Sequence, residues 1–464
     1  MEAFDLVVLG AGPGGYVCAI RAAQLGLRTA IVEKDPSLGG TCLNVGCIPS
    51  KALLESSELV HVAKSEMAGH GITVGDVVFD LSKMMDRKRG IVKQLTDGVG
   101  MLMKKNKITV LRGRAVLRGA GKVSVEGAEG TSDVEAKAVC LAMGSVPVEL
   151  PFMKFDGVHV VSSTEALSFE TVPKRMVVVG AGAVGLELGS VWSRLGSKVT
   201  VLEMLPSITP FADAQAAKTL KKSLEGQGLE IRLETKVTGA KVDGDQVHVS
   251  FDTKDGKSET IVCDRVLVSV GRKPCVDTAG LAEAGVVIER GRVAIDDSFR
   301  TNLPEVYAIG DLVRGPMLAH KASEEGVAVA EIVAGKPGHV NYDAIPNVVY
   351  THPELAQVGL TEEEAKQRGI AFKVGKYFYK ANGRAKSLGA EEGFVKILAE
   401  EKTDRVIGAH IVGARASELI GELVLGMEFR AAAEDVGRTS HAHPTLGEII
   451  KEAALAVDRM AIHG

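Results

Sequence analysis

Aromatic side chains are scarce in this sequence, which has 12 Phe, 6 Tyr and 1 Trp in 464 residues. A binding surface dense in aromatic residues is therefore not expected. The sequence also has no excess of basic residues, because its formal net charge is -4. Nucleic-acid-binding proteins usually carry a positive surface, so this class is not expected. No apolar run reaches the roughly 18 residues of a membrane-spanning helix, so the sequence predicts no membrane span.

The start of the chain leaves little room for a leader segment. Only a few residues precede the strand-like run Leu6–Leu9. We therefore expect neither a signal peptide nor a transit peptide in this sequence, and we predict a cytoplasmic protein or one that has already been processed.

Glycine, by contrast, is abundant, and its 53 residues favour many tight turns between strands and helices. Hydrophobic residues make up 45% of the chain and charged residues 25%, which is the ordinary balance of a soluble globular protein. A single hydrophobic core rarely grows beyond about 250–300 residues, so the length predicts two to four domains.

A strand, a glycine-rich turn, a helix and a second strand occur in this order twice. In each copy the second strand ends on an acidic residue, Glu33 in the first copy and Glu203 in the second, at the same interval from the first glycine. The strands are residues 6–9 and 29–32 in the first copy and 176–179 and 198–202 in the second. The turns have the GxGxxG spacing, through Gly10, Gly12, Gly14 and Gly15 in the first copy and Gly180, Gly182 and Gly185 in the second.

This context is typical of dinucleotide binding. The first glycine makes the tight turn, the second lets the backbone approach the pyrophosphate, and the third allows the helix to pack on the strand. The helix N-terminus then faces the phosphates, and the acidic residue accepts hydrogen bonds from ribose hydroxyls. A glycine-rich turn with an incidental glutamate is the alternative. The two copies together predict two bound dinucleotides, and Glu203 favours NAD at the second site because it would repel the 2′-phosphate of NADP.

Each copy also has a similar closing segment. Residues 138–142 run into 144–147 (GSVP), and residues 265–270 run into 271–274 (GRKP). The repeated order of strand, glycine, two residues and proline predicts equivalent strands of a duplicated fold, with the second copy inserted at about residues 148–275. The expected fold class is therefore α/β, with two Rossmann-like dinucleotide-binding domains.

A third segment, residues 301–311, ends in a strand followed by Gly310 and Asp311. A carboxylate at the end of a strand can accept hydrogen bonds from the hydroxyl groups of a sugar-like chain. Taken alone, the segment is equally consistent with an ordinary turn.

Two of the six cysteines stand close together. Cys42 and Cys47 are five residues apart, and such a pair in a reducing compartment is typical of a catalytic or metal-binding site. A zinc site would need a second cysteine or histidine pair at suitable spacing, which the sequence lacks, so no metal is predicted. The other four lie among apolar neighbours, where buried and inert thiols are expected: Cys18, Cys140, Cys263 and Cys275.

The spacing of the pair constrains its geometry. In an ideal helix, residues five apart have Cα atoms about 8.6 Å apart, whereas a disulfide rarely tolerates more than about 7 Å. A bridge between Cys42 and Cys47 therefore needs a distorted turn, for which Gly46 gives room, and the distortion favours a reducible bond. Thiol–disulfide exchange needs one sulfur to be attacked and a second to leave. Two buried thiols remain the alternative.

Both glycine-rich segments and residues 40–51 (GTCLNVGCIPSK) together resemble the pyridine nucleotide–disulfide oxidoreductase family over essentially the full chain. Within that family, residues 48–51 resemble the dihydrolipoamide dehydrogenase branch. The resemblance implies FAD at the first site and NAD at the second. It also implies oxidation of protein-bound dihydrolipoamide through a cysteine disulfide and FAD, with reduction of NAD+. A related flavoprotein reductase acting on another disulfide is the alternative.

The resemblance assigns roles to single residues. Cys42 is expected to be the interchange sulfur that meets the substrate, and Cys47 the charge-transfer thiolate that faces the flavin. Lys51 is expected near the flavin, paired with Glu187 of the second glycine-rich helix, although a surface ion pair of little value is the alternative. The other predicted contacts are Ser145, Asp311, Met317 and Ala319 for FAD and Gly271 for NAD.

A base is expected near the end of the chain, in residues 441–448 (HAHPTLGE). Oxidation of a dithiol needs a base that works near neutral pH, and histidine is the side chain whose charge changes there. The motif resembles the His–Glu dyad of the family, which makes His443 the predicted base and Glu448 the carboxylate that orients it, with His441 as a weaker candidate. In the family the dyad acts on the disulfide of the other subunit, which implies an obligatory homodimer.

The resemblance also implies the domain order and the partners. The expected domains are 1–147 for FAD and the redox pair, 148–275 for NAD, 276–340 as a central domain that completes the FAD site, and 341–464 as an α+β dimerisation domain. The lipoyl group is expected on a partner, either the acyltransferase subunit of a 2-oxo acid dehydrogenase complex or the lipoyl carrier of glycine cleavage.

Two positions depart from the family pattern. Met143 stands where the family usually has Thr, and Ala183 where a bulkier residue is common, which puts rate and redox potential in question. Glutathione-type reductases use NADPH, which Glu203 opposes, and no cysteine follows Cys275 to supply the extra pair of a mercuric reductase. A non-catalytic nucleotide-binding protein would be expected to lack the cysteines or the dyad.

Overall fold

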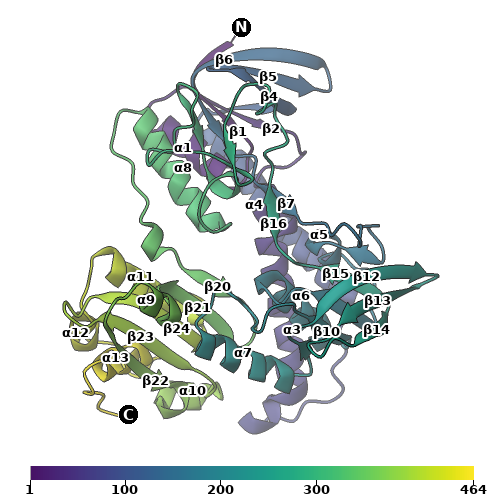
Figure 1. Ribbon diagram of the computed structural model, residues 1–464, viewed down its shortest axis with the longest axis vertical. Coiled ribbons are helices and arrows are strands. Elements are labelled where there is room, and N and C mark those ends of the chain that lie inside the picture. Colours follow the sequence, from purple (N-terminus) through teal and green to yellow (C-terminus); the bar gives the residue numbers. More distant parts are fainter. Residues whose placement is uncertain (1, 464) are drawn as a thin grey trace. The chain divides into compact units, whose positions relative to one another are not determined.

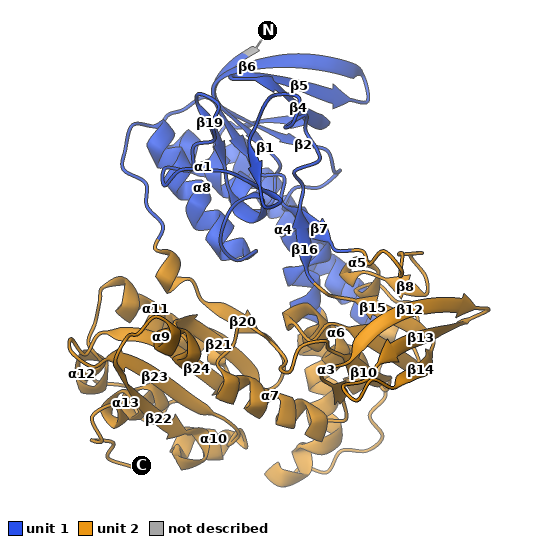
Figure 2. Ribbon diagram, viewed as in Figure 1, with its two compact units in different colours: residues 1–52, 83–148, 271–340 blue, residues 53–82, 149–270, 341–464 orange. Residues whose placement is uncertain are grey.

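The computed structural model describes residues 2–463, which divide into two compact units (Figure 2). Unit 1 contains residues 1–52, 83–148 and 271–340, and unit 2 contains residues 53–82, 149–270 and 341–464. Each unit is therefore assembled from separate stretches of chain. The predicted division into four domains is a finer one and stays a prediction.

Unit 1 is built on a seven-stranded sheet with the order β3-β2-β1-β6-β5-β4, to which β19 adds beside β6 (Figure 1). The central strands are parallel and buried, as expected when helices cover both faces of a sheet. The main elements are β1 (Glu2–Leu9), α1 (Pro13–Gln24), β2 (Thr29–Glu33), α2 (Gly40–Val45), α3 (Cys47–Ser65, which continues into unit 2), α4 (Leu81–Lys105), β3 (Thr109–Arg112), β4 (Arg114–Gly119), β5 (Lys122–Gly127), β6 (Gly130–Leu141), β19 (Val306–Ala308) and α8 (Ala319–Val333).

The sequence predicts that the two closing segments are equivalent. In the structure they pair with each other as strands. Strand β7 (Ser145–Pro147) lies antiparallel to β16 (Arg272–Pro274) in unit 1, and the amide of Val148 donates to the carbonyl of Gly271 at 3.0 Å. A short hairpin of β17 (Ile288–Glu289) and β18 (Arg292–Val293) follows. The chain thus leaves and re-enters unit 1 through two adjacent strands. The insertion expected at about residues 148–275 stays a prediction.

Unit 2 holds the second glycine-rich copy in a five-stranded parallel sheet with the order β11-β10-β9-β15-β8. Phe251 and Val268 belong to one buried apolar cluster, which joins this sheet to the antiparallel sheet β12-β13-β14. The elements are β8 (Val160–Val161), α5 (Ser163–Ala166), β9 (Arg175–Val179), α6 (Ala183–Arg194), β10 (Lys198–Leu202), α7 (Ala214–Gly226), β11 (Glu230–Arg232), β12 (Lys236–Asp243), β13 (Gln246–Asp252), β14 (Ser258–Cys263) and β15 (Arg265–Val268).

The C-terminal part of unit 2 is a five-stranded antiparallel sheet, β20-β21-β24-β23-β22, with helices packed on it. This is the α+β region that the resemblance implies, so the expected fold class is confirmed. Its elements are β20 (Asn347–Val349), β21 (Glu354–Gly359), α9 (Glu362–Gln367), β22 (Phe372–Phe378), α10 (Gly383–Leu388), β23 (Phe394–Glu400), β24 (Val406–Gly413), α11 (Ala416–Glu428), α12 (Ala433–Arg438) and α13 (Gly447–Ala456).

A buried ion network ties this antiparallel sheet to the rest of unit 2. The ammonium of Lys396, on β23, lies 2.7 Å from a carboxylate oxygen of Asp213 and 2.7 Å from one of Glu362. Asp213 also caps α7, because its side chain accepts from the amides of Gln215 and Ala216. Burial opposes ionisation of Asp213, but the hydrogen bond and the charge of Lys396, the charge of His410 and the hydrogen bond from the amide of Ala216 together hold the pKa of Asp213 below its usual value.

Among the residues that the structure describes, no helix combines the length and the apolar character that crossing a bilayer requires.

Candidate active site

The first glycine-rich turn has the geometry that a dinucleotide needs. Gly10 has a φ of 103°, which favours glycine, and a Cβ on Gly15 would lie 1.9 Å from the carbonyl oxygen of Gly10. The carboxylate of Glu33 accepts from the amide of Ala11 at 2.9 Å, so it is held beside the turn. A Cβ on Gly12 would meet no atom within 4 Å, so open space lies at the start of α1. A pyrophosphate fits there.

The second turn repeats this geometry in unit 2. Gly180 has a φ of 101°, and a Cβ on Gly185 would lie 2.2 Å from the carbonyl oxygen of Gly180. Glu203 accepts from the amide of Ala181 at 2.7 Å, and Gly182 again has nothing near its missing Cβ. The chain therefore holds two dinucleotide cradles of the same local structure.

Gly14 marks a difference between the copies. Its missing Cβ would lie 2.9 Å from the carbonyl oxygen of Ala322, on α8. A Cβ on Gly326, also on α8, would lie 2.5 Å from the carbonyl oxygen of Gly14. The second copy has Val184 at the equivalent position, where the side chain is exposed. Gly14 thus permits close packing of α1 on α8, and its predicted cofactor contact stays a prediction.

Ser145 and Asp311 lie together in unit 1, although the sequence separates them widely. The hydroxyl of Ser145 donates to a carboxylate oxygen of Asp311 at 2.5 Å and accepts from Nε of Arg272 at 2.7 Å. Arg272 also donates to the backbone carbonyl of Ser145 at 2.6 Å. Burial lowers the pKa of Arg272, whereas the charges of Asp311 and Cys47 raise it. Arg272 was not predicted as a site residue. Its position directly after Gly271, a predicted cofactor contact, is the feature of the sequence that could have indicated it.

A buried ion pair supports the turn that carries Asp311. Lys321 and Glu325 are both fully buried and lie 3.1 Å apart on α8. Lys321 donates to the carbonyl of Gly310 at 2.8 Å, and Glu325 accepts from the amide of Gly310 at 2.7 Å. The pair fixes both backbone groups of Gly310 and so places Asp311. The nearby predicted contacts Met317 and Ala319 lie just before α8 and at its first residue.

The cysteine pair spans a break between two helices. Helix α2 ends at Val45 and α3 begins at Cys47, with Gly46 between them at φ −143° and ψ −112°. A Cβ on Gly46 would lie 2.9 Å from the carbonyl oxygen of Thr41. The interruption that a Cys42–Cys47 bridge requires is therefore present, at the glycine where the spacing argument places it. Both cysteines are partly buried, and no bond joins their sulfurs.

The surroundings of the pair suit thiol chemistry. The hydrogen bond with Cys47 and then burial raise the pKa of the Cys42 thiol, while the charge of Lys51 acts in the opposite direction. Cys47 is the first residue of α3, where the partial positive charge of the helix N-terminus favours a thiolate. Burial and then the charges of the two cysteines raise the pKa of Tyr16, on α1. Tyr16 was not predicted, and no motif in the sequence marks it.

The histidine motif forms a dyad in unit 2. Nδ1 of His443 lies 2.9 Å from Oε1 of Glu448, and Oε2 of Glu448 accepts from the amide of Thr445 at 2.9 Å. Burial opposes ionisation of Glu448, but the hydrogen bonds from Thr445 and His443 outweigh it and lower the pKa of Glu448. The His443 side chain is 81% exposed, so its ring is accessible.

His441 has a different environment. Its Nε2 lies 2.8 Å from Glu422, its Nδ1 lies 3.0 Å from the carbonyl oxygen of Thr439, and only 7% of its side chain is exposed. Both ring nitrogens are thus engaged within the fold. The geometry favours His443 over His441 as the base, and the role itself stays a prediction.

The predicted pair of Lys51 and Glu187 joins two different units and stays a prediction. Within unit 2, Glu187 is buried on α6 and accepts from the amide of Tyr350 at 3.1 Å. Of the two departures from the family pattern, Met143 packs against the apolar core of unit 1, and Ala183 is the first residue of α6.

Comparison with known proteins decides the family. Residues 4–326 match the pyridine nucleotide-disulphide oxidoreductase model, and residues 345–454 match the dimerisation domain of the same family. The chain belongs to the pyridine nucleotide-disulphide oxidoreductase family.

Relatives within this family match nearly the whole chain. The mitochondrial dihydrolipoyl dehydrogenase of Pisum sativum is 48% identical over 99% of this chain and 92% of its own length. The dihydrolipoyl dehydrogenase of Cupriavidus necator is 49% identical over 99% of each chain. Among solved structures, LpdA from Mycobacterium tuberculosis has a TM-score of 0.89 at 26% identity and covers 98% of this chain and 99% of that one.

Proposed function

We propose that this chain is a dihydrolipoyl dehydrogenase, which oxidises a protein-bound dihydrolipoyl group and reduces NAD+ to NADH. The observation that carries the proposal is the pair Cys42 and Cys47, adjacent across the break at Gly46, in the unit that also holds the first dinucleotide cradle. The names of relatives about half identical over the full chain support the choice of substrate.

The two cradles fit FAD and NAD. In unit 1 the turn at Gly10–Gly15 would hold the pyrophosphate of FAD, Glu33 the adenosine ribose, and Asp311 the ribityl chain. In unit 2 the turn at Gly180–Gly185 would hold NAD, and Glu203 would bind its ribose and repel a 2′-phosphate. When bound, FAD would carry two electrons from the reduced Cys42–Cys47 pair to NAD+.

The residues of the chain carry the sulfur and proton steps. His443, held by Glu448, takes a proton from one thiol of the substrate. The resulting thiolate attacks Sγ of Cys42 in the disulfide, and the Cys42–Cys47 bond breaks with Cys47 leaving as a thiolate. The second substrate sulfur then attacks the first, the mixed-disulfide bond to Sγ of Cys42 breaks, and the proton of the second thiol passes to the departing sulfur of Cys42. The substrate becomes a disulfide, and the cysteine pair has gained its two electrons.

The partners follow from the same proposal. The match to the dimerisation domain supports a homodimer, in which His443 of one copy serves the cysteines of the other. The lipoyl group would arrive on the acyltransferase subunit of a 2-oxo acid dehydrogenase complex or on the glycine-cleavage carrier. We also propose a cytoplasmic location. The relatives include mitochondrial proteins, so similarity to them does not decide between the two compartments.

Substitution of the proposed interchange sulfur tests the function. Cys42→Ser should lower dihydrolipoamide:NAD+ turnover by at least about 1,000-fold, because serine cannot take part in thiol–disulfide exchange. Bound flavin should be retained. Cys263→Ser, a matched change of a buried cysteine in unit 2, should keep turnover near that of the parent protein.

Undiminished turnover in Cys42→Ser would contradict the proposal. A parent protein that binds flavin and oxidises NADH, but ignores dihydrolipoamide, would favour the alternative, a related reductase acting on another disulfide. The two outcomes are distinguishable because the second leaves the cysteine chemistry intact and changes only the substrate.

A further inference from the structure

A cavity of about 440 Å³ lies in unit 2, and its lining includes no residue of the second dinucleotide cradle. It is formed where the end of α3, the end of α7 and the loops before β21 and β23 meet. Its charged and imidazole side chains are His61, Glu66, Lys222, His352, Glu391 and Glu392. None of the residues assigned above to catalysis or cofactor binding lines it.

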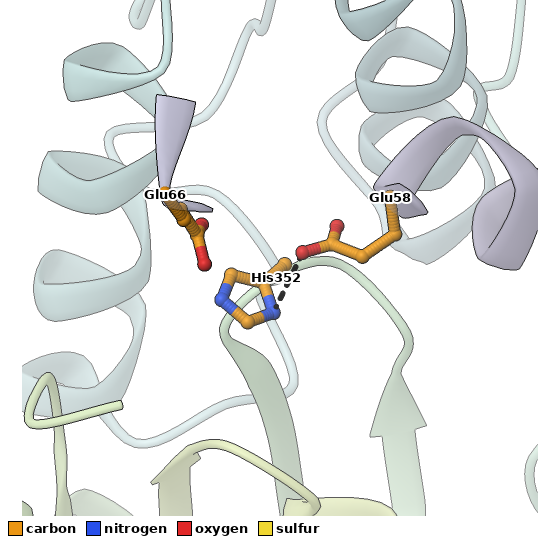
Figure 3. A group of neighbouring side chains, drawn as sticks. All are labelled: Glu58, Glu66 and His352. Carbon is orange, nitrogen blue, oxygen red and sulfur yellow. Dashed lines mark ion pairs between the residues drawn. The ribbon is translucent and has the colours of Figure 1, made fainter. Parts of the chain in front are cut away.

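Three potential metal ligands converge at this cavity. Glu58 lies on α3, Glu66 just past its end, and His352 in the loop between β20 and β21, and one ligand atom of each lies within 4.8 Å of the others. Figure 3 shows the imidazole of His352 between the two carboxylates. Zinc ligands bound at about 2.0–2.2 Å lie within about 4 Å of one another, so small side-chain rotations bring the three atoms onto one ion.

Both carboxylate oxygens of Glu58 are close to nitrogen atoms but lack hydrogen-bond geometry. Its Oε2 lies 2.8 Å from Nη2 of Arg194, and its Oε1 lies 3.1 Å from Nδ1 of His352. Both oxygens are buried, yet neither makes a well-formed hydrogen bond, and the same holds for Nε and Nη2 of Arg194. Buried polar atoms in this state call for an explanation, of which an ion at the site is one.

The arrangement of Arg194 fits such an ion. Only 4% of its side chain is exposed, and it approaches Glu58 from the oxygen that is turned away from His352. Metal-binding carboxylates are commonly oriented by a second residue on their other oxygen, and Arg194 can serve in that way. Two carboxylates against one guanidinium leave a net negative charge, which a divalent cation compensates while a neutral imidazole coordinates it.

A fourth ligand is close by. Nε2 of His61, on α3, lies 3.5 Å from Oε1 of Glu66. We propose that Glu58, Glu66 and His352 bind a divalent transition-metal ion, with His61 or a water molecule from the cavity in the fourth position. Mixed imidazole and carboxylate ligands suit Zn²⁺ best. The ion fastens the far end of α3, the helix that starts at Cys47, to the loop that precedes β21.

The test uses the flavin-loaded protein with the Cys42–Cys47 pair oxidised, so that these sulfurs offer no thiolate. Calorimetric titration with Zn²⁺ should show about one site, and both Glu66→Gln and His352→Gln should weaken it at least about 10-fold. X-ray absorption at the zinc edge should show only nitrogen and oxygen neighbours near about 2.0–2.1 Å, because zinc–sulfur bonds are longer, at about 2.3 Å.

The matched control is His159→Gln. His159 is paired with a single carboxylate, that of Asp156 at 3.5 Å, in the same unit, and its loss should leave zinc binding unchanged. Glu66 is 40% exposed, so Glu66→Gln should leave the fold intact. If His352→Gln is unstable, the zinc affinity of Glu66→Gln alone tests the proposal. No binding, sulfur neighbours, or equal affinity in Glu66→Gln and the parent protein would each overturn the proposal.

Discussion

At the scale of single residues, two neighbouring histidines differ in how far their side chains are exposed to solvent, and this difference separates the proposed base from a structural residue. His441 and His443 each pair with a carboxylate at 2.8–2.9 Å. The side chain of His441 is 7% exposed and that of His443 is 81% exposed, so only the second can meet a substrate thiol without rearrangement. The proposed base is therefore distinguished by accessibility, not by the presence of a partner.

This distinction predicts different effects of the same substitution. His443→Gln should lower kcat for dihydrolipoamide oxidation by about 100- to 10,000-fold, the usual contribution of a general base, with unchanged thermal stability. His441→Gln should mainly lower the melting temperature, because it leaves the carboxylate of Glu422 without its partner. Steady-state kinetics and thermal unfolding of both variants check this, and the reverse pattern would assign the base to His441.

The proposed reacting residues could be singled out in the sequence because they lie in local motifs, and their roles stay predictions. Cys42, Cys47, His443 and Glu448 lie in short segments whose spacing already limits their geometry. Arg272, which binds Ser145, lies far along the chain from its partner, and the contact depends on the pairing of β7 with β16. No local pattern reports such a contact.

At the scale of elements, the strand–turn–helix copies were predictable for the same reason. Strongly apolar strands and glycine spacing predicted the two copies. The strands β2, β9 and β10 lie within one residue of the predicted bounds, whereas β1 begins at Glu2, four residues before its predicted start. The sheet β12-β13-β14 was not predicted. Strand β12 is mostly exposed, with a weak alternation of buried and exposed residues, so its sequence does not differ from that of a loop.

The buried lysine on β23 was equally hidden in the sequence. A lysine in a strand is usually exposed, and the partner Asp213 belongs to a helix cap in another part of unit 2. Lys396→Met should lower the free energy of unfolding by about 3–5 kcal/mol, because it leaves the buried carboxylate of Asp213 unpaired. Chemical denaturation with two independent probes measures the effect.

The control for this variant is a lysine in an exposed pair. Lys373 lies 2.7 Å from Asp458, and both side chains are more than a third exposed. Lys373→Met should change the stability by less than about 1 kcal/mol. Equal losses in the two variants would show that burial of the Lys396 network does not control the stability of unit 2.

At the scale of the whole molecule, the proposed reaction needs both units. The cysteine pair and the first cradle belong to unit 1, whereas the second cradle and the His–Glu dyad belong to unit 2. The sites of unit 1 and those of unit 2 can therefore each be intact in a protein that does not oxidise dihydrolipoamide. A measurement that follows electrons from the thiol substrate to the nucleotide tests the account more directly than any single variant.

That measurement is an anaerobic titration of the purified yellow protein, followed by its visible spectrum. Dihydrolipoamide should produce a long-wavelength absorption band after two electrons, and the reduced protein should then reduce NAD+ but not NADP+, because Glu203 repels the 2′-phosphate. This result would support the cysteine pair, the flavin and the nucleotide preference together. A flavin that NADH bleaches but dihydrolipoamide leaves unchanged would contradict the central claim.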